Sequence, residues 1–156
     1  MVAKRARHTA LLMIASLAAC RGPRDPILAL LDELKKAAES RDAGAIAARL
    51  TEDFQGEHEV RSAEVRSMLE RYFLAYQKVH VDVYDVEVER GQAEAKLRFR
   101  ADFNGRPLQI GSLGGFLPPS AMLRFELGLR RTPAGWRVAR ADWEEVAPVE
   151  REGSRN

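Results

Sequence analysis

Cys20 is the only cysteine in the chain, so its thiol can form no internal disulfide. The stretch before it has a basic start, residues 4–7, and then about eleven apolar or small residues, 9–19. Charged residues first, an apolar run second and small residues last are typical of a secretory signal peptide. The run is well short of the roughly 20 apolar residues that a membrane-spanning helix needs. We therefore predict that residues 1–19 direct export and are then removed.

The residues Leu17-Ala18-Ala19-Cys20 resemble the lipobox of bacterial lipoproteins, a leucine and two small residues before a cysteine. The resemblance implies that the thiol is acylated, that the chain is cleaved before Cys20, and that the lipid bilayer holds the protein through this residue. It also implies a cell-envelope location, facing the periplasm from the outer membrane if the host has one. Several acyl chains anchor stably, since each buried methylene contributes about 0.8 kcal/mol. A chance match is the alternative, but it would leave a free thiol in an oxidising compartment.

The charge balance gives no support for nucleic-acid binding. Three of the 25 basic residues leave with the leader, so the mature chain has fewer basic residues than its 23 acidic ones. Charges of both signs are interspersed, as on an ordinary solvated surface. The mature length fits one domain. We assign residues 20–25 to a short tether, 26–146 to the domain and 147–156 to a flexible polar tail.

The first half of the domain shows helical spacing of apolar residues. One helix is predicted over 27–39, with Asp25 as its N-cap and Pro26 at the first helical position. A shorter helix is predicted over 43–50, and the polar stretch 51–60 is expected to be irregular.

The strongest helical pattern begins at Ser62, which we expect to cap it. Apolar residues then recur every three or four positions on one stripe: Val65, Met68, Leu69, Tyr72, Phe73 and Tyr76. The tyrosines on this buried stripe need hydrogen-bond partners for their hydroxyls.

After Lys78 the apolar period changes to two, which predicts an antiparallel sheet of at least four strands. The phase slips near Tyr84-Asp85, which indicates a β-bulge. Turns are expected at Arg90-Gly91, Asn104-Gly105 and 132–135. The inward face of the two central strands should carry Ala93, Ala95, Leu97, Phe99, Ala101, Phe103, Ala121, Leu123, Phe125, Leu127 and Leu129.

The last strand, from Trp136, has two registers open to it. Without a bulge, Arg140 and Asp142 face the interior, where a paired arginine and aspartate would be a candidate polar site. With a bulge near Ala139, Trp143 faces inward instead. We favour the bulge, because tryptophan is a large group to leave exposed.

The order of elements predicts an α+β fold, with N-terminal helices packed on a curved antiparallel sheet. The sequence resembles the nuclear transport factor 2-like (SnoaL-like, cystatin-like) superfamily over about 26–146. Four stretches carry the resemblance: 42–47, 51–54, the helix from Ser62 running into Val79, and the hairpin at 134–138.

This resemblance implies a cone with a pocket between helices and sheet, lined by Tyr72, Tyr76, Phe99, Phe103, Phe125 and Trp143. Catalytic relatives place an Asp or His base there and a tyrosine that donates to an oxyanion. The two tyrosines of the helical stripe are candidates for that donor; plain core positions are the alternative.

No metal site or cofactor is predicted, because His58 and His80 have no second ligand at suitable spacing. The glycine-rich stretch 106–120 also lacks a following helix that could bind phosphate. Its apolar residues Leu113, Phe116 and Leu117 form either a lid over the pocket or part of the core.

Three functions remain. We predict a non-catalytic module that binds an apolar small molecule or an envelope protein, because no convincing acid–base pair is present. The alternatives are an isomerase or hydratase that uses the pocket, and a structural homodimer that uses the sheet face.

Overall fold

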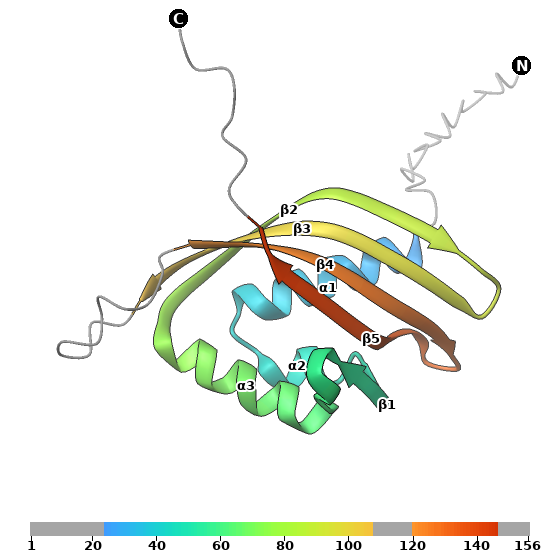
Figure 1. Cartoon of the computed structure of the whole chain (residues 1–156), viewed down its shortest axis with the longest axis horizontal. Helices are drawn as coiled ribbons and strands as arrows, with labels where there is room; N and C mark the ends of the chain where they lie inside the picture. The colour runs from blue at the N-terminus through green and yellow to red at the C-terminus, as the bar shows by residue number, and fades with distance from the viewer. Residues whose placement is uncertain (1–23, 108–119, 147–156) are drawn as a thin grey trace, which may run out of the picture.

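The computed structural model describes residues 24–107 and 120–146 (Figure 1). The predicted leader, Cys20, the predicted lid residues Leu113, Phe116 and Leu117, and the tail from 147 lie outside these ranges. The elements are α1 (Pro26–Glu39), α2 (Ala43–Ala47), β1 (Leu50–Gly56), the 3₁₀ helix η1 (Glu57–Glu59), α3 (Ser62–Ala75), β2 (Tyr76–Arg90), β3 (Glu94–Pro107), β4 (Ser120–Thr132) and β5 (Gly135–Glu145).

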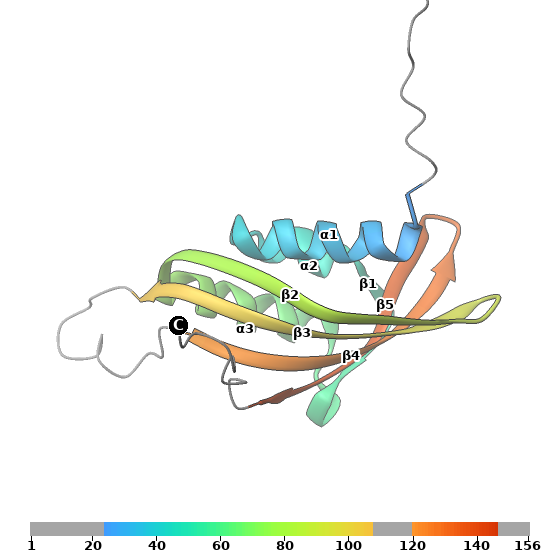
Figure 2. The same cartoon turned by 90° about the horizontal axis from the view of Figure 1, so that it is seen from above.

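A five-stranded sheet in the order β1-β5-β4-β3-β2 arches over the helices (Figure 1). Four strands form an antiparallel meander, and β1 pairs with β5 in parallel. Figure 2 shows α1 running alongside β2. The end of α1 is tied to this edge strand, because the Glu39 carboxylate accepts from the backbone N–H of Val81 at 3.1 Å. The predicted α+β fold, with helices packed on a curved sheet, is confirmed.

The helix starts follow the capping chemistry of the sequence. The Asp25 carboxylate accepts from the N–H of Ile27 at 2.9 Å, and Pro26 opens α1. The N-cap of α3 is Arg61 rather than the predicted Ser62, because the Glu64 carboxylate bonds back to the Arg61 N–H at 2.7 Å. That bond satisfies a backbone donor at the helix start.

Both predicted irregularities in the sheet are present. The β2–β3 register shifts between Tyr84 and Glu87, and Asp85 has a φ of 51°. In the β4–β5 ladder Arg140 pairs with Gly128 while Val138 pairs with Leu129, so Ala139 is the extra residue of a bulge. The bulge resets the alternation, and it decides which side chains of β5 face the helices.

Three predictions about the segments were wrong. The helix α2 ends at Ala47 rather than at residue 50, and most of the strand β1 lies in the stretch 51–60 that was expected to be irregular. A single fully buried anchor, Phe54, holds β1 against the core with 1% of its surface exposed. The Asn104-Gly105 turn is absent, because both residues continue β3 in pairing with β2.

The core fills the space between the helices and the inner sheet face. Its buried residues include Ile27, Leu30, Leu31, Val65, Phe73, Val79, Val81, Ala95, Leu97, Phe99, Ala101, Leu127, Leu129 and Val138. The predicted inward face of the central strands is confirmed for Ala95, Leu97, Phe99, Ala101, Leu127 and Leu129. Ala93 was wrongly included, because it is exposed and β3 begins only at Glu94. Packing is incomplete toward one side of this core, where a cavity remains.

Candidate ligand-binding cavity

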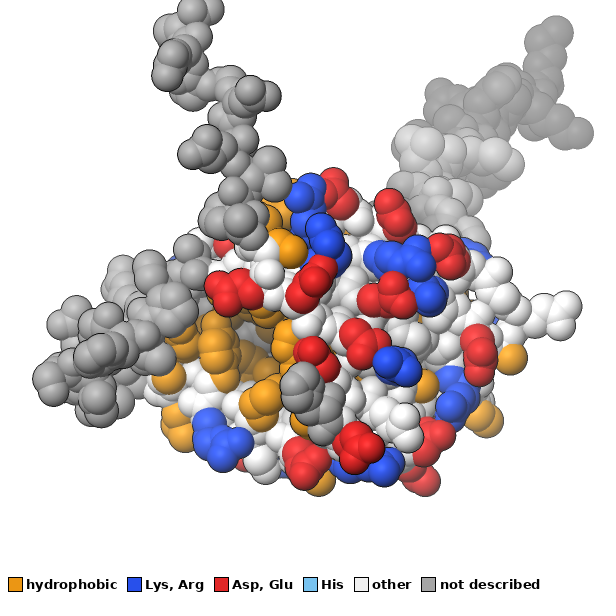
Figure 3. Space-filling model, viewed as in Figure 1, with side chains coloured by type: hydrophobic (Ala, Val, Ile, Leu, Met, Phe, Trp, Pro, Cys, Tyr) orange, Lys and Arg blue, Asp and Glu red, His pale blue; other side chains and the backbone are white. Residues whose placement is uncertain are grey.

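A cavity of about 380 Å³ lies between α1, α3 and the concave sheet face. Figure 3 shows hydrophobic side chains gathered around a hollow on this side of the molecule. Pockets for small molecules typically have volumes of about 300–1,000 Å³ and mostly apolar linings. The size and character of this cavity therefore suit a small apolar molecule.

Aromatic side chains from three neighbouring strands form one wall of the cavity. The rings of Phe99 and Phe125 stack with centroids 5.0 Å apart, and Phe103 lies 6.1 Å from Phe125 at a steeper angle. Trp143 is the direct partner of Phe125 in the β4–β5 ladder and also lines the cavity. The structure thus brings together these four residues of the predicted lining, with Tyr72 facing them from α3.

Tyr76 does not line the cavity. It begins β2 rather than ending the helix, and only 3% of its surface is exposed. Its ring packs against Gly105 of β3 and lies 4.7 Å from that of Tyr72. The prediction that Tyr76 lines the pocket is corrected, because the chain leaves the helical path one residue before it.

The Tyr72 hydroxyl is a hydrogen-bond donor rather than a base. The pKa of Tyr72 is raised to about 12, and burial of the side chain is the largest cause. The charge of Tyr76 and a hydrogen bond with Tyr76 raise this pKa further. A phenol with that pKa stays protonated at neutral pH.

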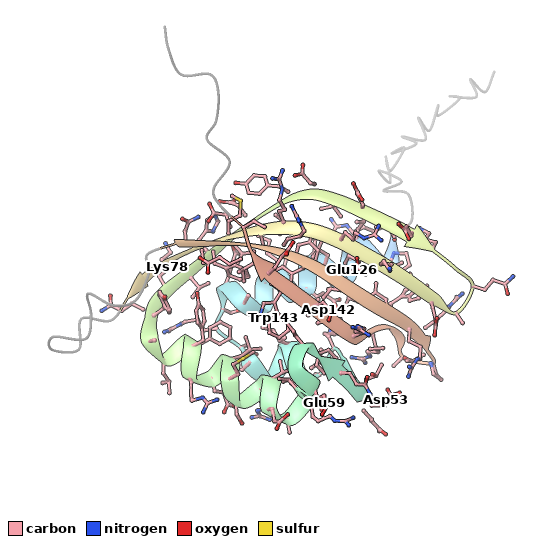
Figure 4. All side chains as sticks on the ribbon, in the orientation of Figure 1. Asp53, Glu59, Lys78, Glu126, Asp142 and Trp143 are labelled. Atoms are coloured by element: carbon pink, nitrogen blue, oxygen red, sulfur yellow. The ribbon has the colours of Figure 1, made fainter. Side chains whose placement is uncertain are left out.

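Arg140 and Asp142 lie on the outer face of the sheet, outside the cavity. Their side chains are 67% and 40% exposed, and the Arg140 Nε donates to the Asp142 Oδ2 at 2.7 Å. Figure 4 labels Asp142 and its neighbour Trp143 on β5. The bulge at Ala139 turns Trp143 inward and the charged pair outward. The interpretation of this pair as a polar pocket site is therefore corrected.

Sequence reasoning missed Lys35, the only charged residue among the described lining residues. Leu31, Leu34, Lys35 and Ala38 share one face of α1 and all border the cavity. The signal was present, because position 35 lies four residues after Leu31 and three before Ala38, a spacing that puts side chains on one helix face. A lysine on a helix is ordinarily solvated, so its charge gives no sign that it borders a cavity.

The described lining contains no Asp, Glu or His side chain. His80 lies elsewhere, between the carboxylates of Glu39 at 2.8 Å and Asp82 at 3.3 Å, and is half exposed. Within 24–107 and 120–146, no group of three acidic, His or Cys side chains is arranged to hold a metal ion. Within the same ranges, no helix combines the length and apolar character needed to cross a membrane.

Comparison with solved structures identifies the architecture. A proposed dehydratase from the NTF2-like family of Streptomyces avermitilis superposes with a TM-score of 0.65 at 15% identity, over 79% of this chain and 95% of that one. An NTF2-like protein of unknown function from Pseudomonas putida gives 0.62 at 16% identity, over 80% and 87%. The chain has the NTF2-like fold.

Another neighbour in shape is a proposed aromatic ring hydroxylase from Novosphingobium aromaticivorans, with a TM-score of 0.66 at 18% identity over 79% of this chain and 88% of that one. The sequence itself matches no family model and no curated protein. At these identities the likeness shows the fold alone, so the function must be argued from the cavity.

Proposed function

We propose that this NTF2-like domain binds a small apolar molecule in the cavity between α1, α3 and the sheet. The observation that carries the proposal is the cavity of about 380 Å³, whose described walls are apolar apart from Lys35, the Tyr72 hydroxyl and the Trp143 indole N–H. Removing apolar surface from water contributes about 25 cal/mol per Å². A ligand that fits these walls therefore gains most of its affinity from burial.

An enzyme of the dehydratase or isomerase type is the second candidate. One neighbour in shape is named a proposed dehydratase, and another is named a proposed aromatic ring hydroxylase. Proton abstraction in such an enzyme needs a base with a pKa near the working pH. The described lining supplies Tyr72, whose pKa is about 12, and Lys35, but no carboxylate or imidazole. This composition favours binding over acid–base catalysis.

The binding proposal is tested with phenylnaphthylamine, a neutral probe whose fluorescence rises in apolar surroundings. The protein is the 156-residue chain carrying Cys20→Ser, so that no acyl chain of its own competes for the cavity. We expect saturable binding of one probe per chain. Ala141→Phe fills part of the cavity and should weaken probe binding at least tenfold, because Ala141 lines it.

Ala139→Phe is the matched control. Ala139 lies on the same strand, but it borders a separate groove on the outer sheet face rather than the cavity. It should leave probe affinity within twofold of the parent. Equal weakening by both substitutions, or an absence of saturable binding in the parent, would overturn the proposal.

We further propose that the domain is held at the cell envelope by an acylated Cys20. The support is the leader-like order of residues 1–19 and the lipobox-like sequence that ends in the sole cysteine. Four residues, 21–24, lie between that cysteine and the Asp25 cap of α1, so five Cα–Cα steps span at most about 17 Å. The domain would therefore lie close to the bilayer.

Intact-mass measurement of the protein extracted from bacterial membranes tests the anchor. The expected mass begins at Cys20 and includes the added acyl groups, and the Cys20→Ser chain should be absent from the membrane fraction. An uncleaved chain with an unmodified thiol would contradict the anchor and leave the binding proposal to its own test.

A further inference from the structure

Lys35 is the one charged side chain that the described residues place at an otherwise apolar cavity. It projects from the same face of α1 as Leu31 and Leu34, and its side chain is 32% exposed. An ammonium group at the edge of a low-dielectric cavity interacts more strongly with an anion than the same group in open water does. Its aliphatic stem can line the apolar wall while the charged end stays near water.

Lys35 is only weakly engaged within the protein. Its single described ion pair joins Nζ to the Glu39 Oε1 at 4.0 Å, the outer limit of such contacts. The same Glu39 oxygen is already 2.8 Å from the His80 Nδ1 and accepts from the Val81 N–H at 3.1 Å. Glu39 is thus committed to the edge of β2, and its repulsion of an incoming anion is reduced by those donors.

We infer that the ligand of this cavity is an anionic amphiphile, an apolar body with one carboxylate-type group that pairs with Lys35. The inference rests on the proposed function and deepens it. The walls bury the apolar body, and Lys35 selects for a single negative charge at one end. A cation at the same end would be repelled, so the site discriminates by charge as well as by apolar area.

The test compares three probes with the same chain length: dodecanoate and dodecyltrimethylammonium, each below its micelle concentration, and dodecanol below its solubility limit. The protein is again the full chain carrying Cys20→Ser, and binding is measured by calorimetry.

Tryptophan fluorescence gives a second readout of binding. The chain has two tryptophans, and Trp136→Phe leaves only Trp143, which lines the cavity. We expect dodecanoate to bind about fivefold to tenfold more tightly than dodecanol, a difference that lies between the effect of an exposed ion pair and that of a hydrogen bond to a charged group. The cationic probe should bind most weakly.

Lys35→Met keeps the apolar stem and removes the charge, so it should abolish the preference for dodecanoate while leaving dodecanol affinity unchanged. Lys36→Met is the matched control, because Lys36 is the next residue on α1, is exposed and does not line the cavity. Equal affinity of the parent for dodecanoate and dodecanol, or equal losses in the two lysine variants, would overturn the inference alone. Binding of neither probe would overturn the proposed function with it.

Discussion

Gly105 occupies a position where a larger residue has no room. A Cβ at this position would lie 2.5 Å from the Cδ1 of the Tyr76 ring, which is buried in the core. Gly105→Ala must displace that ring or bend β3, and overpacking of this kind costs about 1–3 kcal/mol. Denaturant unfolding of the variant should show a loss in that range.

Gly128→Ala provides the comparison for this prediction. Its added Cβ would lie 3.2 Å from the Arg140 Cβ on the outer sheet face, a contact that a shift of β5 by a few tenths of an ångström relieves. Its unfolding free energy should stay within about 0.5 kcal/mol of the parent. If the two alanine variants lose the same stability, the packing of Tyr76 on Gly105 is not what excludes a side chain there.

The second prediction at the residue scale concerns the Tyr72 hydroxyl. Burial, reinforced by Tyr76, raises the pKa of Tyr72 from 10.0 to about 12 in the folded chain. The folded state therefore holds this proton more tightly than the unfolded state. The stability that results is complete below pH 10 and is lost as the pH rises toward 12.

Tyr72→Phe has no proton to lose, so its unfolding free energy should fall less steeply than that of the parent between pH 10 and 12. Urea unfolding at several pH values in this window measures the difference. Parallel pH profiles for the two proteins would show that Tyr72 titrates normally.

At the scale of elements, the start of α1 depends on Asp25. Its carboxylate accepts from the Ile27 N–H at 2.9 Å and also contacts the Arg90 guanidinium. Asp25→Ala should lower the unfolding free energy by about 1 kcal/mol, the usual value of an N-cap. Asp25→Ser keeps a capping oxygen without the charge and should recover most of that loss in urea unfolding. A serine variant as unstable as the alanine one would assign the effect to the Arg90 contact.

The sequence predicted those elements whose regularly spaced apolar residues face the core in the folded structure. The stripe of α3 and the alternation of β3 bury apolar faces, and both were found at nearly the predicted places. It did not predict β1, because an edge strand with one fully buried anchor, Phe54, has little periodicity to detect. The paired residues of β5 are 85 to 88 positions away in sequence, so no local signal reports the pairing.

The site was predictable to a similar degree and for related reasons. Alternation along β3 and β4 correctly placed Phe99, Phe103 and Phe125 toward the helices, where they line the cavity. Tyr76 was misplaced because helix spacing was extended across the point where α3 becomes β2. A single change of element moves a side chain from the cavity into the core, and apolar spacing alone does not locate that change.

At the scale of the whole molecule, the two faces of the sheet have separate roles. The outer face carries charges of both signs in ion pairs such as Arg98–Glu126 at 2.8 Å and Arg130–Asp53 at 2.8 Å. Exposed pairs of this kind contribute little to stability. The inner face supplies most of the core, yet it also borders a cavity that leaves part of its apolar area unburied. Stability and the proposed ligand binding therefore depend on one surface.

This shared dependence yields the last prediction. A molecule that binds only the folded state stabilises it by about 2.7 kcal/mol when its concentration is one hundred times its dissociation constant. Dodecanoate at that concentration should therefore raise the midpoint of thermal unfolding of the parent chain.

Ala141→Phe buries more apolar area in the cavity without a ligand, so its own midpoint should equal or exceed that of the parent, as cavity-filling substitutions commonly do. The same dodecanoate concentration should then raise the variant's midpoint by at most about half as much, because binding weakened at least tenfold stabilises the folded state by about 1.4 kcal/mol or less. Equal increases in both proteins would mean that the amphiphile binds elsewhere on the fold.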